Sequence, residues 1–167
     1  MIGKNEIYEL LKNNNVRHEI TEHCAVFNMK ELERIDLPYA DCDAKNLFVK
    51  AQNGKGFYLI TVKGNKKADL NAFRKSNGIP RLSFATPDEL YDILSLIPGS
   101  VGPFGLLNDA ERKVVFYIDK QLFEGKGIVG VHPNDNTATV WIKTVDLVEL
   151  IRGHGNACFV VDIPTVE

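Results

Sequence analysis

The pattern of hydrophobic and polar positions shows two neighbouring runs rich in apolar and β-forming residues, 45–52 and 57–63. Such runs are typical of β-strands, whose successive side chains point to opposite faces of a sheet. A short Asn-Gly-Lys-Gly segment, residues 53–56, separates the two stretches and has the composition of a hairpin loop. The sequence therefore predicts a β-hairpin. In its first strand, Lys45 shares a face with Leu47 and Val49, whereas Asn46 and Phe48 share the other.

Apolar residues recur at helical spacing in five further segments. The clearest is 87–94, where Thr86 is a candidate N-cap, Pro87 occupies the first helical position and Glu89 can close a capping box. Asp69 can cap a second helix that runs to about Ser76. Shorter helices are expected around residues 7–11, 28–35 and 144–151.

Further strands are predicted over residues 16–21, 113–118, 128–132, 137–142 and 157–161. The segment 98–105 contains three glycines and two prolines, so we expect it to be irregular. Residues 162–167 are expected to fray. Because helices and strands are intermixed and several strands are joined by short loops, we expect a mixed α/β (α+β) domain spanning residues 1–167. Its sheet should be mixed, partly closed and barrel-like, with helices packed around it.

Length and composition narrow the class of protein. A chain of 167 residues that is 44% hydrophobic can form one domain with a real core. The longest apolar runs are too short to cross a bilayer, and the first residues lack the apolar stretch of a signal peptide. We therefore expect a cytoplasmic protein without a membrane partner. The three cysteines form no Cys-x-x-Cys pair and are interpreted as reduced, mostly buried thiols.

The charge balance limits the possible partners. A net charge of −2 excludes a general polyanion-binding protein, and no DNA partner is expected. Basic residues nevertheless gather between Lys63 and Arg81. They fit either a solvated charged face or local contact with a nucleic-acid backbone.

Three segments can carry chemistry. Lys45 lies in line with apolar positions, so it either extends to water along its own stem or meets an anionic ligand in a cleft. The loop from Gly99 to Gly105 can present backbone N–H groups to a carbonyl oxygen or a phosphate. His132 directly follows an apolar strand and can be a general base, a steric gate or a turn residue. His18 and His23 have the wrong spacing for a helical metal pair, and neither a metal nor another cofactor is expected.

These motifs, taken in order, carry a resemblance to a known family. Ala44-Lys45-Asn46-Leu47-Phe48, the Gly99-x-x-x-Pro103 loop with Phe104, and Gly130-Val131-His132-Pro133-Asn134 resemble the YbaK-like aminoacyl-tRNA editing family. Within it, the chain is most similar to the free-standing prolyl-tRNA editing type and to the editing insertion domain of bacterial prolyl-tRNA synthetases. The resemblance covers nearly the whole chain.

The resemblance implies a fold, an activity and a set of site residues. It implies hydrolysis of the ester in mischarged Ala-tRNA(Pro), with the tRNA acceptor end as partner. Lys45, Gly99 and Pro103 take the catalytic positions, with Lys45 as the lysine required for deacylation and the other two in the loop that contacts the terminal adenosine and the ester. The residues so assigned to substrate binding are Asn46, Ser100, Val101, Gly102, Phe104 and His132.

Three questions stay open at the level of sequence. A sister activity of the YbaK type would remove cysteine in place of alanine. A non-catalytic module that senses aminoacylated tRNA would use the same fold without hydrolysis. The weak overall charge also allows a prolyl-tRNA synthetase partner to supply recognition of the tRNA body.

Overall fold

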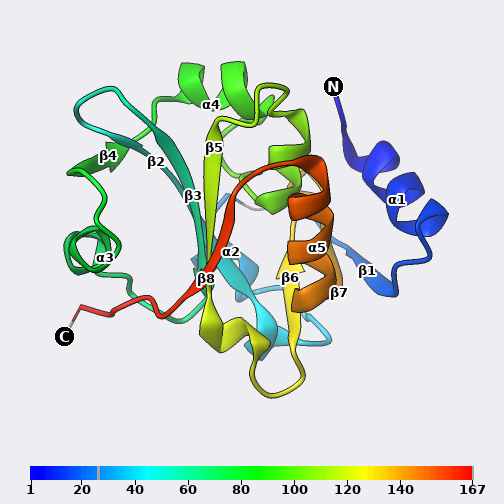
Figure 1. The fold of residues 1–167 in the computed structure, drawn as a ribbon. Helices are drawn as coiled ribbons and strands as arrows, with labels where there is room; N and C mark the ends of the chain where they lie inside the picture. Colours follow the sequence, from blue (N-terminus) through cyan, green and yellow to red (C-terminus); the bar gives the residue numbers. More distant parts are fainter. Residues whose placement is uncertain (26, 167) are drawn as a thin grey trace.

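The computed structural model describes residues 1–25 and 27–166, except for the side chains of Met29 and Leu32. Its strands form two sheets (Figure 1). The larger sheet has the strand order β4-β2-β3-β5-β8. Its strands are β2 (Ala44–Ala51), β3 (Phe57–Lys63), β4 (Leu82–Phe84), β5 (Val114–Asp119) and β8 (Cys158–Val161). β2 pairs antiparallel with both β3 and β4, whereas β3–β5 and β5–β8 are parallel, so the sheet is mixed as expected.

The smaller sheet is antiparallel, with the order β1-β7-β6. Its strands are β1 (His18–Glu22), β6 (Ile128–Val131) and β7 (Ala138–Lys143). A single bridge between Asp43 and Gly130 links it to the start of β2. The two sheets are therefore joined at one point and do not close into a barrel. Gly130 is needed in β6 because a Cβ atom there would lie 2.4 Å from Cζ3 of Trp141, which packs across it from β7.

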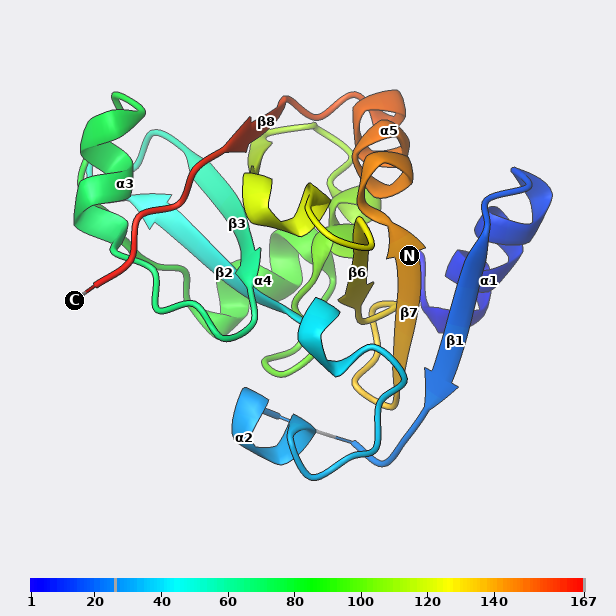
Figure 2. The same cartoon turned by 90° about the horizontal axis from the view of Figure 1, so that it is seen from below.

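The helices cover both faces of the larger sheet. The α-helices are α1 (Lys4–Asn13), α2 (Met29–Leu32), α3 (Leu70–Ser76), α4 (Pro87–Leu94) and α5 (Thr144–His154). Three short 3₁₀-helices complete the structure: η1 (Ala40–Cys42), η2 (Pro103–Asn108) and η3 (Lys120–Phe123). Helix α3 lies on the opposite side of the larger sheet from α5, and α1 lies at the far end of the molecule from α3 (Figures 1 and 2).

Two cores follow from the alternation in the central strands. Phe48 and Leu59 face the main core, which the smaller sheet, α4, α5 and η2 complete. Val49 and Ile60, one position further on in each strand, face a second core that Phe73 of α3 closes. The expected hairpin and its alternation are thus confirmed.

The capped helices also match the expectation. Helix α4 has the capping box between Thr86 and Glu89, and the Asp69 side chain accepts a hydrogen bond from the Ala72 N–H at the start of α3. Helix α2 is shorter than the predicted 28–35, and α5 extends beyond the predicted 144–151.

Two sequence-based expectations are wrong. The segment 98–105 is not irregular throughout, because Pro103 begins the helix η2, where its fixed φ suits the first helical turn. The C-terminal tail does not fray over its described residues. Thr165 bridges to Ala68, and the Asp69 N–H donates to the Pro164 carbonyl at 2.8 Å.

Candidate functional site

Lys45 and Asn46 lie on opposite faces of β2. Lys45 is partly buried on the side of Leu47 and Val49, and it makes no hydrogen bond or ion pair with another described residue. Its cationic head is therefore available to a ligand. Asn46 is held from the other side, because its Oδ1 accepts a hydrogen bond from the buried Thr61 hydroxyl at 2.6 Å. This bond fixes the amide and leaves its NH₂ group as a donor.

A pocket of about 230 Å³ lies beside Asn46. It is smaller than the roughly 300–1,000 Å³ of pockets that hold drug-sized ligands, so it suits a small group. Its lining is mostly apolar and comes from β2, the β4–α4 connection and the glycine-containing loop. The lining residues are Asn46, Leu47, Phe48, Phe84, Ala85, Pro87, Leu90, Pro98, Gly99 and Val101. Two of the three predicted motifs therefore meet in one cavity.

The loop before η2 is folded tightly on itself. Gly99 has φ +96°, a conformation that favours glycine, and a Cβ atom there would lie 2.9 Å from Cδ1 of Phe27. The Ser100 hydroxyl donates to the Ile97 carbonyl at 2.8 Å, so it is used inside the loop. Pro103 is buried at the start of η2, and Phe104 is fully buried in the main core. Gly99 and Val101 face the pocket, whereas Ser100 and Phe104 support the loop from within.

His132 adjoins the same loop from the other side. A Cβ atom on Gly102 would lie 3.5 Å from the His132 carbonyl oxygen, so the two backbones are in contact. The His132 Nδ1 lies 2.8 Å from the Ala138 carbonyl, which can only accept, so Nδ1 carries the proton. Burial lowers the pKa of His132 below its ordinary value. The ring is therefore neutral at neutral pH and presents Nε2 as an acceptor.

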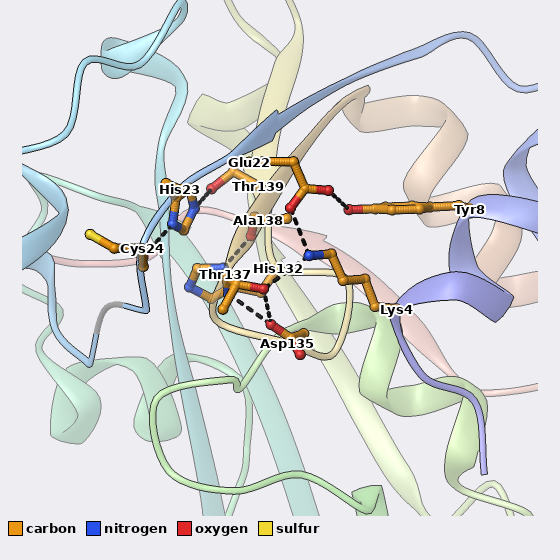
Figure 3. A network of polar contacts seen from close by, with 10 residues as sticks. All are labelled: Lys4, Tyr8, Glu22, His23, Cys24, His132, Asp135, Thr137, Ala138 and Thr139. Carbon is orange, nitrogen blue, oxygen red and sulfur yellow. Dashed lines mark hydrogen bonds and ion pairs between the residues drawn. The ribbon is translucent and has the colours of Figure 1, made fainter.

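A second histidine accompanies His132. The rings of His23 and His132 are 6.0 Å apart between centroids and meet edge to face. His23 is held by the Cys24 carbonyl at its Nδ1 and by the Thr139 hydroxyl at its Nε2, at 2.8 and 2.9 Å (Figure 3). In the sequence, His23 is a candidate only as a metal ligand. Its place beside His132 depends on the pairing of β1 with β7 and has no local sequence signal.

A polar network braces the turn that carries His132. Lys4 of α1 bonds to both Glu22 of β1 and Thr137 of the turn, at 2.7 and 2.9 Å (Figure 3). The Thr137 N–H and hydroxyl both donate to the Asp135 carboxylate. These hydrogen bonds lower the pKa of Asp135, and the bond from Lys4 lowers the pKa of Glu22. Asn134 has φ +61°, which asparagine tolerates in tight turns.

Asp43 is an unexpected ionisable group next to the Lys45 motif. It bridges to Gly130 at the junction of the two sheets. Burial, with a smaller contribution from the charge of Asp41, raises its pKa from 3.8 to about 7. Its carboxyl group makes no hydrogen bond or ion pair with another described residue.

The predicted basic cluster is divided by the fold. Lys66 forms a buried ion pair with Asp119 at 2.9 Å and is not available at the surface. Arg74 and Arg81 instead line a pocket of about 420 Å³ with Gln52 and Asn71, at the far end of β4 from Phe84. Neither arginine pairs with a carboxylate in the described part of the chain. This cationic pocket and the candidate site are therefore lined by opposite ends of β4, Leu82 and Phe84.

Within residues 1–25 and 27–166, no group of three or more His, Cys, Asp or Glu side chains could hold a metal ion. In the same part of the chain, no helix combines the length and the apolar character needed to cross a membrane.

Comparison with known proteins confirms the resemblance stated above. The model of a family described as the aminoacyl-tRNA editing domain matches residues 25–150, and the chain belongs to that family. More particularly, it is 35% identical to the "Prolyl-tRNA editing protein ProX" of Acetoanaerobium sticklandii, over 98% of this chain and 99% of the relative. It is also 29% identical to the "Prolyl-tRNA synthetase associated domain-containing protein 1" of Bos taurus, over 84% of each chain.

The fold has solved counterparts. The crystal structure of a proposed trans-editing enzyme for prolyl-tRNA synthetase superposes with a TM-score of 0.69 at 18% identity, and the match covers 98% of this chain and 97% of that one. The expected mixed α/β editing-domain fold is therefore confirmed.

Proposed function

We propose that this protein is a trans-editing deacylase that hydrolyses the ester of mischarged Ala-tRNA(Pro) in the cytoplasm. One observation carries the proposal: Asn46 of the Lys45 motif and Gly99 and Val101 of the loop line one small pocket of about 230 Å³. The near full-length similarity to a prolyl-tRNA editing protein supports the same substrate.

The size of the pocket fits the need for editing. A synthetase site built for proline rejects a smaller apolar amino acid poorly, because a missing methylene group is worth only about 1–3 kcal/mol. A second site that accepts only small groups can hydrolyse the wrong ester and spare the correct one. Pro98, Val101 and Leu90 are rigid or branched residues that can form such a sieve.

The chain's own groups suggest how hydrolysis proceeds. A water oxygen forms a bond to the ester carbonyl carbon and gives up a proton, and the bond to the ribose oxygen then breaks as that oxygen takes up a proton and leaves as a hydroxyl group. The N–H groups of Val101 and Gly102 donate to no described residue, so they can stabilise the oxyanion. Lys45 holds the terminal ribose or phosphate as a cation. The neutral Nε2 of His132 is an acceptor at the wall of the site.

The cationic pocket of Arg74 and Arg81 can hold the backbone of the acceptor end. The short strand β4 separates it from the candidate site, with Leu82 lining the cationic pocket and Phe84 lining the other. Arginine is well suited to phosphate because its planar group donates two parallel hydrogen bonds. A synthetase partner would add recognition of the tRNA body beyond this contact.

Deacylation assays on Ala-, Cys- and Pro-tRNA(Pro) at matched concentrations test the proposal. We expect rapid release of alanine and little release of proline. Preferential release of cysteine would identify the sister activity. Tight tRNA binding without any ester hydrolysis would contradict the enzyme and favour an aminoacyl-tRNA sensor.

A further inference from the structure

Strand β2 has two different neighbours on the edge that faces away from β3. Near its start, Asp43 bridges to Gly130 of β6. Near its end, residues Val49–Ala51 pair with β4. Asn46 lies between these two contacts and has no strand partner on this edge among the described residues. On this edge the sheet therefore has a gap along residues 44–47, between Asp43 and Phe48.

The hydrogen bonds along β2 show which backbone groups face β3. The Ala51 N–H donates to Gly56, and the Asp43 carbonyl accepts from Gly64, and both partners belong to the β3 side of the hairpin. In an antiparallel pair, residues that bond to a given neighbour alternate along the strand. Residues 43, 45, 47, 49 and 51 therefore direct their backbone groups toward β3.

The intervening residues direct theirs toward the other edge. The Phe48 carbonyl accepts from the Ala85 N–H at 3.1 Å, and the Gln52 N–H donates to the Arg81 carbonyl at 2.8 Å. By the same alternation, the N–H and C=O of Asn46 point into the gap. On this edge Asn46 belongs to no strand pairing among the described residues, and no described loop residue bonds to either group.

Asn46, which lies at this gap, also lines the 230 Å³ pocket, together with apolar residues that include Phe48, Leu90 and Val101. An unpaired N–H and C=O beside apolar walls require a partner that supplies one acceptor and one donor. The volume limits this partner to a small group. A neighbouring strand residue would satisfy both backbone groups, because directly bonded antiparallel residues exchange two hydrogen bonds.

We propose that the aminoacyl group of the substrate occupies this gap as if it were one residue of an added β-strand. Its ester carbonyl oxygen accepts a hydrogen bond from the Asn46 N–H, and its α-ammonium donates to the Asn46 carbonyl. The inference rests on the proposed function, and it deepens it by assigning the atoms that hold the main chain of the amino acid.

This arrangement has two chemical consequences. The Asn46 N–H lies where negative charge develops when water attacks, so it adds an oxyanion donor to those of the loop. The carbonyl of Asn46 recognises the α-ammonium, a group that every free amino-acid ester carries. Selection of alanine must then come from the pocket walls, and the α-ammonium becomes a requirement of the reaction.

A series of esters on the same tRNA tests the requirement. Alanyl-tRNA carries the α-ammonium, lactyl-tRNA replaces it with a hydroxyl group, and propionyl-tRNA has hydrogen there. Each enzymatic rate is divided by the rate in buffer alone, because the α-ammonium also activates the ester chemically. We expect this rate enhancement to fall about 10- to 100-fold from alanyl to propionyl, as the loss of a charge-assisted hydrogen bond predicts, with lactyl between them.

The outcomes separate the inference from the proposed function. Equal enhancement for alanyl- and propionyl-tRNA would overturn strand-like pairing and leave the deacylase intact. No enhancement for alanyl-tRNA would overturn the deacylase itself and the inference with it.

Replacing the Asn46 N–H by an ester oxygen, with the side chain kept, tests the protein side. The ester also weakens the Lys45 carbonyl as an acceptor toward β3, so we expect the variant to stay folded with a somewhat lower thermal midpoint. The rate on alanyl-tRNA should fall about tenfold or more. An unchanged rate in the folded variant would contradict the contact.

Discussion

The side chains of adjacent residues in a strand point to opposite faces of the sheet. In the candidate site this separates the side chains of Lys45 and Asn46. The alternation places the cation on the side of Leu47 and the amide beside the pocket. A charge that held the phosphate or ribose from within the pocket would have to be desolvated among apolar walls, which is costly. With the two groups on separate faces, Lys45 can stay partly hydrated while Asn46 contacts the small group.

The role of Lys45 can be tested by exchanging it for alanine and for arginine. A positioning cation predicts that Lys45→Ala lowers the deacylation rate on alanyl-tRNA by roughly 10- to 100-fold, and that Lys45→Arg restores most of it. Arginine keeps the charge but cannot act as a base at neutral pH. Single-turnover rates are the measurement. An inactive arginine variant that still binds tRNA would favour proton transfer by lysine.

Asp43 predicts an unusual pH dependence of stability. Its folded pKa of about 7 lies above its ordinary 3.8, so between these values the folded state binds a proton that the unfolded state releases. Folding stability is therefore greatest below pH 3.8 with respect to this group and is lost as the pH rises to about 7.

We expect Asp43→Asn to be roughly 1–3 kcal/mol more stable than the wild type at pH 8 and nearly equal to it at pH 4. Urea unfolding at several pH values measures this difference. The lowered pKa of His132 makes stability depend on pH in the opposite direction, but it does so equally in both proteins and therefore cancels. Asp36→Asn is the matched control, because Asp36 is exposed, does not contribute to the pKa shift of Asp43 and should change stability little. A difference that does not vary with pH would contradict the raised pKa.

Some of these residues could be predicted from the sequence and others could not. Local signals made Lys45 and the Gly99 loop candidates, and the family resemblance assigned roles to Asn46 and Gly99. Phe27, His23 and Asp43 gave no signal, since their surroundings come from residues distant in the chain. Ser100 is an intermediate case: its loop was identified, but the use of its hydroxyl by Ile97 depends on the folded turn.

At the scale of elements, the same local chemistry determined α4 and misled the interpretation of the loop before η2. Thr86, Pro87 and Glu89 specify a helix start whatever surrounds them, so α4 was predicted with its correct bounds. Pro103 also begins a helix, but the nearby glycines hid it. Glycine permits an irregular backbone but does not require one. The helix η2 forms where Phe104 packs into the main core.

The glycines of this loop differ in what they tolerate, which provides a matched pair of variants. Gly99→Ala forces an L-residue to φ +96° and places Cβ against Phe27, so we expect a loss of roughly 1–3 kcal/mol in stability and a lower deacylation rate. Gly102 has φ −172°, an ordinary extended conformation, and its added Cβ would meet His132 at van der Waals distance. Gly102→Ala should change the free energy of unfolding by less than about 0.5 kcal/mol. Equal losses in chemical denaturation would contradict this distinction.

At the scale of the whole molecule, the site arises where two sheets separate. One edge of the β2 segment contacts β6 through a bridge near its start and pairs with β4 near its end. The sequence of the hairpin predicts neither contact. β4 has only three residues and was not predicted, so the gap at Asn46 could not be anticipated. Long-range pairing determines which backbone groups remain unpaired, whereas composition determines only which residues can surround them.

The position of the gap relative to the cationic pocket predicts how tRNA is held. If Arg74 and Arg81 bind backbone phosphates, Arg74→Ala/Arg81→Ala should raise KM for alanyl-tRNA with little change in kcat, and should reduce the slope of log KM against log salt by about one per lost contact. Lys12→Ala/Arg17→Ala removes two exposed cations from α1 and from its connection to β1, and is the matched control. These elements lie at the opposite end of the molecule from α3 (Figure 2). Because nonspecific attraction depends on total charge, equal effects of the two double variants would mean that the protein attracts tRNA without a defined path. A larger effect at Arg74 and Arg81 would place the acceptor end along β4, with its phosphates at one end of this strand and its ester at the other.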